Sequence, residues 1–304
     1  MRILSGNINL EVKDLGSKTD TPLIMISGFG SQLIDWPKDL IEKLIEKELR
    51  VIIFDNRDVG LSYKFSGEII EDPKLIWRYS YSRKKLPKEI NKPRIPYTLT
   101  NMAEDCANIL NALDIDKAHI LGTSMGGMIA QLMAFNFPEK SKSLISVMST
   151  SGNPDLPRAS KEVIEGLNRT PESNDKESVI KNSLLTRKLW ASPKYSIPEK
   201  TLIKNFSLRY DRMYYPEGLS RQYAAIGDDG SRVERLKKIN VPSLILHGDS
   251  DNLVPIEGGI DTKKLIPNAK MEILEGWGHD LPSGVHDWFS TKISNHIYSI
   301  EDLS

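Results

Sequence analysis

The chain has 304 residues, of which 39% are hydrophobic and 27% are charged, a balance that is ordinary for a soluble α/β domain carrying an insertion. Its formal net charge is +0, so neither a nucleic acid nor a membrane surface is indicated as a partner. The single cysteine excludes an intrachain disulfide.

The N-terminal residues 1–7 lack the apolar core and the small-residue cleavage site of a signal peptide. No apolar run in the sequence approaches the length that spans a membrane. We therefore expect a cytoplasmic protein.

The first part of the chain shows the hydrophobic pattern of strands and a helix. Residues 7–12 alternate between apolar and polar side chains, which predicts an edge strand. The continuous apolar runs 23–26 and 51–54 predict two buried strands, and the apolar spacing between them predicts a helix over 36–49. A strand, a helix and a strand in this order predict a parallel crossover unit.

A polar turn is expected at residues 55–62, directly after the second buried strand. Asp55 and Asp58 are a candidate pair of catalytic carboxylates, but they flank Arg57. This arrangement favours a structural ion-pair turn.

The next segment, residues 63–97, is less regular and punctuated by prolines, which predicts a partly helical excursion over one face. Its basic run at 83–85 is interpreted as a solvated face. An amphipathic helix is then predicted over 100–113, with Thr100 as its N-cap. Cys106 is interpreted as a small buried hydrophobe on this helix.

The pattern G-x-S-x-G surrounds Ser124, between an apolar strand at 118–121 and a helix at 125–137. In this pattern the serine backbone lies in a strained turn, so the residues two before and two after it must nearly lack side chains; Gly122 and Gly126 satisfy this need. The turn is expected to present the hydroxyl at a helix N-terminus, where the dipole and free N–H groups favour developing negative charge. Ser124 is therefore the candidate nucleophile.

The composition changes after a strand predicted at 144–148. Residues 154–231 are polar, punctuated by prolines and without strand-like runs, and the strand pattern resumes at 241–246. A helical block between two strands of one sheet predicts a cap inserted into a core of residues 1–153 and 232–304. Helical character within the insertion is expected at 161–167, 178–190 and 202–210. The chain ends with a predicted helix, strand and helix at 258–266, 270–274 and 282–298.

A serine nucleophile needs a base, and the base needs an orienting acid. In sheets that carry this strained serine turn, called the nucleophile elbow, the order along the chain is serine, acid, histidine. His279 alone among the five histidines follows a strand closely in a glycine-rich loop, so it is the candidate base. The acid is expected after the strand that ends at His247, and Asp251 is favoured because it lies deeper in the loop than Asp249, which we interpret as a turn residue capping its own backbone. Asp280 is too close to His279 in sequence to reach the imidazole nitrogen that faces away from the serine.

An oxyanion needs two preorganised donors. The backbone N–H of Met125, after the nucleophile, is one candidate, and that of Phe29, in the glycine-rich loop after the strand at 23–26, is the other. Gly28 and Gly30 lack the third glycine of a dinucleotide fingerprint, and the sequence contains neither a P-loop nor a cluster with metal-ligand spacing. We therefore expect no cofactor and no metal.

Four motifs together resemble the α/β-hydrolase superfamily, with the closest similarity to the esterase branch that includes aclacinomycin methylesterase-like enzymes. They are GTSMGG at 122–127, DNRDVGLS at 55–62, HGDSDNLVP at 247–255 and GWGHDLP at 276–282. The resemblance covers nearly the whole chain, and the insertion is its least distinctive part.

This resemblance implies an eight-stranded, mostly parallel sheet with helices on both faces and a helical cap. It implies Ser124 as nucleophile, Asp251 as acid and His279 as base, without a cofactor. One departure is that the usual His-Gly of the oxyanion loop is Ser27-Gly28 here. Gly28 keeps the backbone donation from the next residue, and the structural role of the missing histidine is expected to pass to Ser27.

We therefore expect a serine hydrolase that cleaves small-molecule carboxylic esters through an acyl-enzyme. Three alternatives stay open: a C–C bond hydrolase or a cofactor-free perhydrolase with the same triad, and a non-catalytic hydrolase-like binding protein. A dehalogenase or an epoxide hydrolase is disfavoured, because those relatives carry an aspartate where Ser124 stands. The sequence indicates neither the natural substrate nor the oligomeric state.

The predicted cap contains aromatic and basic residues for which the sequence allows two roles each. Trp190, Tyr210, Tyr214 and Tyr215 either line the pocket or pack the cap. Arg209 and Arg212 are candidates for carboxylate recognition, but we expect them to be solvated on the surface.

Overall fold

The computed structural model describes residues 1–70, 72–81 and 93–302. These residues form one eight-stranded sheet in the order β1-β2-β4-β3-β5-β6-β7-β8. The pairs β1–β2 and β2–β4 are antiparallel and the other neighbours are parallel, which confirms the prediction of a mostly parallel sheet. The strands are β1 (Arg2–Ser5), β2 (Ile8–Leu15), β3 (Thr21–Ile26), β4 (Leu49–Phe54), β5 (Ala118–Thr123), β6 (Ser141–Val147), β7 (Ser243–Gly248) and β8 (Lys270–Leu274).

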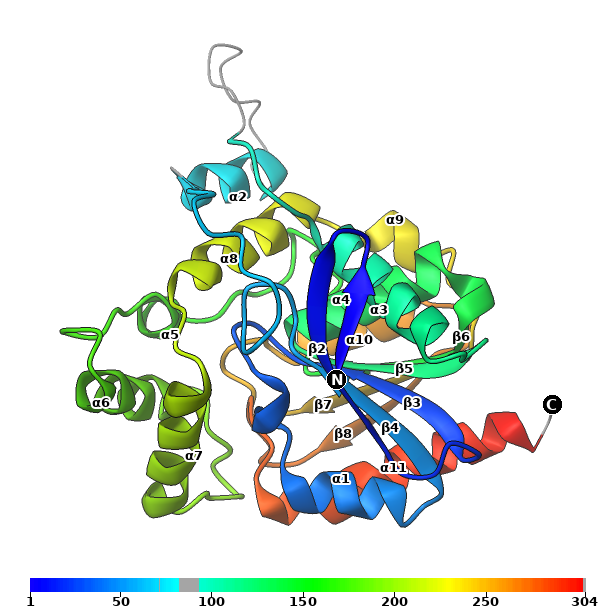
Figure 1. Ribbon diagram of the computed structural model, residues 1–304. Coiled ribbons are helices and arrows are strands. Elements are labelled where there is room, and N and C mark those ends of the chain that lie inside the picture. Colours follow the sequence, from blue (N-terminus) through cyan, green and yellow to red (C-terminus); the bar gives the residue numbers. More distant parts are fainter. Residues whose placement is uncertain (71, 82–92, 303–304) are drawn as a thin grey trace.

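Helices cover both faces of the sheet (Figure 1). One face is covered by α1 (Lys38–Ile45) and α11 (Ser283–Glu301), and the other by α3 (Leu99–Ala112), α4 (Met125–Asn136), α9 (Val233–Leu236) and α10 (Glu257–Leu265). Successive side chains of a strand point to opposite faces, so the apolar run of β3 serves both layers. Leu23 and Met25 join the cluster with α1 and α11, whereas Ile24 and Ile26 join the cluster with α3 and α4.

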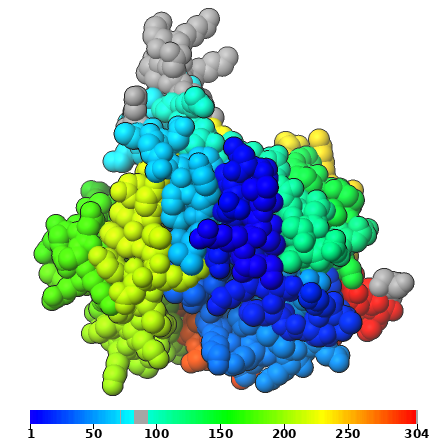
Figure 2. Space-filling model, in the orientation of Figure 1, coloured from blue at the N-terminus to red at the C-terminus, as the bar shows by residue number. Residues whose placement is uncertain are grey.

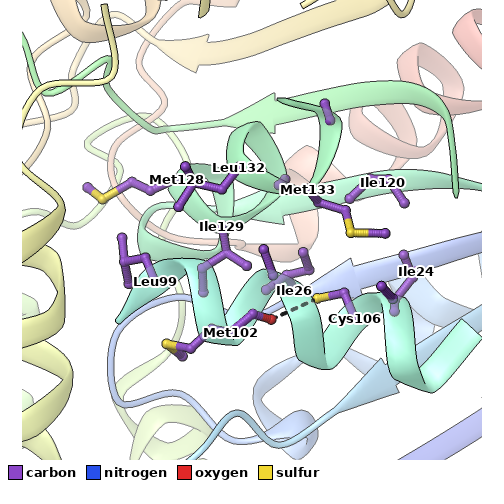
Figure 3. Close-up of a cluster of buried hydrophobic side chains, with 14 of the residues drawn as sticks. Ile24, Ile26, Leu99, Met102, Cys106, Ile120, Met128, Ile129, Leu132 and Met133 are labelled. Carbon is purple, nitrogen blue, oxygen red and sulfur yellow. Dashed lines mark hydrogen bonds between the residues drawn. The ribbon is translucent and has the colours of Figure 1, made fainter. Parts of the chain in front are cut away.

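The larger of these clusters holds the elbow helix α4 against the sheet (Figure 3). Ile129 and Met133 of α4 are buried in it together with side chains of α3 and β3. Cys106 is buried on α3, and its thiol contacts the carbonyl oxygen of Met102 at 3.4 Å. The prediction of a small buried hydrophobe on a helix is therefore confirmed.

The N-terminal end of the sheet differs from the prediction of an edge strand at 7–12. Strand β1 pairs with β2 and forms the edge instead, and the two strands are joined at Gly6, whose φ is +58°. Arg2 and Leu4 are exposed and alternate with Ile3 and Ser5, which are buried, so the short strand has the alternation that marks a half-buried edge.

Two helix boundaries also differ from those predicted from the apolar spacing. Helix α1 spans only Lys38–Ile45, because Glu48 adopts a positive φ of 51° and the next residue, Leu49, begins β4. Helix α3 begins earlier than expected, because Thr98 is its N-cap in place of Thr100. The Thr98 hydroxyl accepts the Asn101 N–H at 3.2 Å.

Four of the five helices between β6 and β7, here called the inserted helices, form a lobe beside the sheet (green to yellow in Figures 1 and 2). They are α5 (Lys161–Leu167), α6 (Lys176–Arg187), α7 (Glu199–Arg212) and α8 (Glu217–Asp229). Helix α8, which the sequence did not predict, packs against α2 (Pro73–Tyr81). Two short 3-10 helices are also present, η1 (Leu33–Asp35) and η2 (Pro138–Lys140).

Two further expectations concern segments outside the sheet. The basic run at 83–85 lies outside the described residues, so its interpretation as a solvated face stays a prediction. Within the described ranges, none of the helices has the length and apolar character that crossing a membrane requires.

Candidate active site

Ser124 lies at the junction of β5 and α4 with φ 55° and ψ −119°, a strained conformation for a residue with a side chain. A Cβ added to Gly122 would overlap the carbonyl oxygen of Gly126, and a Cβ added to Gly126 would overlap that of Ile26. Gly127 is also constrained, since its Cβ would lie 2.6 Å from Cβ of Ser149. The predicted need for glycine on both sides of the serine therefore has a direct steric cause.

The glycine-rich loop after β3 lies against the serine. A Cβ at Gly28 would be 3.3 Å from Cβ of Ser124 and 3.9 Å from its Oγ. Met125 is the first residue of α4, so its N–H has no acceptor within the helix. Phe29 and Met125, the predicted oxyanion donors, line the same cavity as Ser124.

The glycine-rich loop is held through its backbone. The amide of Asn56 donates to the carbonyl oxygen of Ser27 at 3.1 Å. The Ser27 hydroxyl itself is buried and has no hydrogen-bond partner among the described residues, so the expected transfer of the missing histidine's structural role to this side chain stays a prediction. Further along, Gly30 donates its N–H to Oε1 of Gln222 at 2.8 Å, and its carbonyl oxygen accepts from Nη2 of Arg209 at 2.5 Å.

His279 and Asp251 form a hydrogen-bonded pair. Nδ1 of His279 lies 2.6 Å from Oδ2 of Asp251, and Oδ1 accepts the N–H groups of Leu253 and Val254 at 2.9 and 2.8 Å. Burial disfavours the charged carboxylate, but the neighbouring charge of His279 and the imidazole of His247 outweigh burial and hold the pKa of Asp251 well below its usual range. The carboxylate is thus ionised and fixed in orientation.

The neighbouring carboxylates have other partners. Asp249 was expected to cap its own backbone, but its Oδ1 accepts the N–H of Gly276 at 2.7 Å. Asp251 caps the local backbone instead, by accepting the N–H of Leu253, in addition to its contact with His279. Asp280 is buried against Arg187 and Ser192, which confirms that it does not orient the imidazole.

Two of the other histidines have partners of their own. His119 contacts Ser143 at 2.7 Å and Glu301 at 2.9 Å, and His286, which also lines the cavity, contacts Asp39 at 2.5 Å. His279 lines the same cavity as Ser124 and has Asp251 on its Nδ1, which makes it the candidate base.

Ser124 and His279 face one cavity of about 1580 Å³. In the described part of the chain the two side chains share this wall without a direct hydrogen bond between them. Catalytic hydrogen bonds in an enzyme without substrate are often long and tighten only in the complex. The arrangement can therefore support proton transfer from the serine once a substrate orders the site.

The cavity wall is contributed by the sheet-bearing part and by the inserted helices, and it is mainly apolar. Trp77 and Met128 come from the former, and Phe206 comes from the latter. Of the four aromatic residues predicted either to line the pocket or to pack the cap, Trp190 lies on the described wall. The other three pack within the insertion: Tyr210 and Tyr214 stack at 5.0 Å between centroids, and Tyr215 accepts from Arg221.

The two arginines expected to be solvated on the surface are structural. Nη2 of Arg212 donates to buried Asp55 at 2.7 Å, and Nη1 donates to Gln32 at 2.7 Å. Its side chain is 16% exposed. The contacts of Arg209 and Gln222 with Gly30 gave no signal in the sequence, because these partners lie far apart along the chain.

The turn at 55–62 contains ion pairs, but not the pairs expected. Nε of Arg57 donates to Asp105 on α3 at 2.5 Å. Asp58 accepts from Arg221 of α8 at 2.8 and 3.0 Å. Together with the contact of Asn56 with Ser27, the turn therefore joins the glycine-rich loop and α3 to the inserted helices.

Within residues 1–70, 72–81 and 93–302, no group of three or more His, Cys, Asp or Glu side chains is arranged to hold a metal ion.

Comparison with known proteins identifies the family and the fold. The family model for the alpha/beta hydrolase fold matches residues 21–282. A rhodomycin D methylesterase of Streptomyces sp. (strain C5) is 24% identical over 97% of this chain and 96% of its own length. A 2-hydroxy-6-oxononadienedioate/2-hydroxy-6-oxononatrienedioate hydrolase of Dechloromonas aromatica (strain RCB) is 25% identical over 92% of this chain and 88% of its own length.

A solved structure is similar over the same extent. The enol-lactonase from Burkholderia xenovorans LB400 superposes with a TM-score of 0.72 at 16% identity, covering 98% of this chain and 99% of that one. The fold and the family match both extend across the sheet and the inserted helices. The chain therefore belongs to the family of the alpha/beta hydrolase fold.

Proposed function

We propose that this hydrolase cleaves carboxylic esters with Ser124 as nucleophile, His279 as base and Asp251 as the acid that orients the base. The observation that carries the proposal is the 2.6 Å contact between His279 Nδ1 and Asp251 on the wall of the cavity that Ser124 also faces. A buried carboxylate on Nδ1 fixes the tautomer that leaves Nε2 free to accept a proton.

The reaction proceeds in two halves. Oγ of Ser124 forms a bond to the ester carbonyl carbon while its proton passes to Nε2 of His279, and the N–H groups of Phe29 and Met125 hold the oxyanion. The C–O bond to the alcohol breaks, and the alcohol leaves with the proton from His279. Water then gives a proton to the same nitrogen and attacks the acyl-enzyme, which releases the acid and restores Ser124.

We also propose that residues 154–231 act as a cap on a core of residues 1–153 and 232–304. The cavity wall supports this division, because it draws on side chains of both parts. In this arrangement the cap sets the size of the acyl and alcohol groups.

A C–C bond hydrolase is the second candidate. The name of the Dechloromonas relative gives a hydroxy-oxo-dienedioate as its substrate, whereas the Streptomyces relative is named a methylesterase. Both reactions use the same triad logic, so the site geometry favours neither by itself.

The proposal is tested by hydrolysis of p-nitrophenyl esters from acetate to palmitate. Ser124→Ala should lower kcat by several orders of magnitude with an unchanged melting temperature, whereas Ser290→Ala, a buried serine of α11, serves as the matched control. Covalent labelling by a serine-directed phosphonate without ester turnover would favour the C–C reaction, to be tested with a dienedioate. Absence of both turnover and labelling in the folded wild type would refute the hydrolase assignment.

A further inference from the structure

The loop that carries His279 is attached to a segment of the insertion, residues 187–194, that lies far away along the chain. The N–H of His279 donates to the carbonyl oxygen of Trp190 at 2.8 Å. On one side of it, the N–H of Gly278 donates to Oγ of Ser192 at 2.9 Å. A Cβ at Gly278 would lie 2.6 Å from the Trp190 carbonyl oxygen, so the two backbones touch.

Asp280 stands at the centre of this attachment. Its carboxylate accepts from Nη2 of Arg187 at 2.7 Å, from the N–H of Ser192 at 3.2 Å and from the Ser192 hydroxyl. Its carbonyl oxygen accepts from Nε1 of Trp277 at 2.7 Å, and the Trp277 ring is fully buried. The residue is therefore fixed through both its side chain and its backbone.

The Ser192 hydroxyl links two of these contacts, because it donates to Asp280 and accepts from Gly278. Its side chain and that of Asp280 are both buried, so water does not readily replace either contact. The hydroxyl thus connects the residue before His279 to the residue after it.

This network bears on position rather than on proton transfer. The imidazole already has Asp251 on Nδ1 at 2.6 Å, and both carboxylate oxygens of Asp280 are occupied by Ser192 and Arg187. Asp280 and Arg187 also line the cavity, but their contacts act on His279 through the backbone of the loop. Displacement of a catalytic group by about 1 Å can cost about 100-fold in rate.

We propose that Asp280 and Ser192 are positioning residues that align His279 with Ser124, so that the insertion completes the acid–base half of the site. The proposal rests on the proposed function, since it presumes that His279 activates Ser124. It assigns the 187–194 segment a role that is distinct from shaping the substrate pocket.

Ser192→Ala removes the linking hydroxyl and leaves the Asp280–Arg187 pair in place. For p-nitrophenyl acetate we expect kcat to fall by about 10-fold with KM within about twofold, because alignment rather than binding is lost. Ser192→Thr keeps the hydroxyl and should restore most of kcat. Ser290→Ala, which removes a buried hydroxyl that donates to the carbonyl oxygen of Asp287 on its own helix, is the matched control and should retain wild-type kcat.

The decisive readout is the rate constant of labelling by a serine-directed phosphonate. A partly unfolded sample lowers the amplitude of labelling, whereas a misaligned His279 lowers the rate constant at full amplitude. We expect the rate constant to fall in parallel with kcat in Ser192→Ala. Asp280→Asn should show a larger fall of about 100-fold; if this variant does not fold, Ser192→Ala decides the question.

Two outcomes contradict the proposal in distinguishable ways. If wild type is labelled and folded Ser192→Ala is labelled at the same rate, the positioning role is wrong and the proposed function stands. If wild type is not labelled at all, the proposed function fails, and the positioning role fails with it.

Discussion

Replacing Asp251 by asparagine tests the acid of the proposed triad with a change of one atom. Oδ1 is fixed by the N–H groups of Leu253 and Val254 at 2.9 and 2.8 Å, so the amide oxygen of the asparagine should occupy the same position. The amide NH₂ group then takes the place of Oδ2, which lies 2.6 Å from Nδ1 of His279. Two donors cannot face each other at this distance.

The imidazole is therefore expected to change its tautomer. Nδ1 becomes an acceptor and the ring proton moves to Nε2, the nitrogen that must take the proton of Ser124. A change of this kind costs about 10⁴-fold in kcat in a serine triad, which corresponds to about 5 kcal/mol in the activation free energy. The fold itself should be retained, because the amide oxygen keeps both backbone contacts.

The assay is steady-state hydrolysis of p-nitrophenyl acetate by Asp251→Asn, with Asp249→Asn as the matched control. Asp249 is the neighbouring carboxylate, and its Oδ1 accepts the N–H of Gly276 and the hydroxyl of Ser250. An amide oxygen can accept both bonds, so kcat of the control should stay within about fivefold of wild type. If folded Asp251→Asn retains more than a tenth of wild-type kcat, or if Asp249→Asn loses as much, the assignment of the acid is wrong.

Two further predictions concern the folded state. Gly126→Ala should destabilise the protein by more than about 3 kcal/mol, because its Cβ overlaps the carbonyl oxygen of Ile26; Gly6→Ala, which meets nothing within 4 Å and bears only the strain of a positive φ, should lose about 1 kcal/mol in the same urea titration. Equal losses would contradict the steric account. Burial lowers the pKa of His119 to about 4 despite the opposing effect of Glu301, whereas the pKa of an unfolded histidine is near 6.5. Between these two pH values only the unfolded state binds this proton, so the folded state loses stability as the pH falls. The free energy of unfolding should therefore drop by about 2 kcal/mol from pH 7 to pH 5 through this residue, and a His119→Gln variant with an equal drop would refute the assignment.

The sequence pattern was sufficient to predict an element where neighbouring residues alone determine its geometry. The elbow at Ser124 depends on two glycines and a strand-to-helix change within a few residues, so its geometry could be predicted. Residues 270–274 were predicted as a strand and form β8 with these bounds, although none of the five is fully buried. The boundaries of α1 and α3 could not be predicted so closely, since a positive φ at Glu48 and a cap at Thr98 decide them.

The order of serine, acid and histidine along the chain identified the candidate residues, because the parallel strands of this sheet bring the loops at their carboxyl ends together. The choice between Asp249 and Asp251 rested on depth in the loop, and the structure pairs His279 with Asp251. The contact of Asp249 with Gly276 could not be foreseen, because it joins two loops whose relative height depends on the packing of β7 and β8.

The sequence by itself determined the sheet, its helical layers and the residues that meet beside Ser124, since hydrophobic periodicity and glycine placement act over short distances. Only the tertiary structure decided what holds these residues in place. Arg212 with Asp55, Gln222 with Gly30, and Ser192 with Gly278 are each separated by more than 80 residues. Such pairs form only when the inserted helices dock on the sheet, and polar side chains carry no periodic signal that names a distant partner.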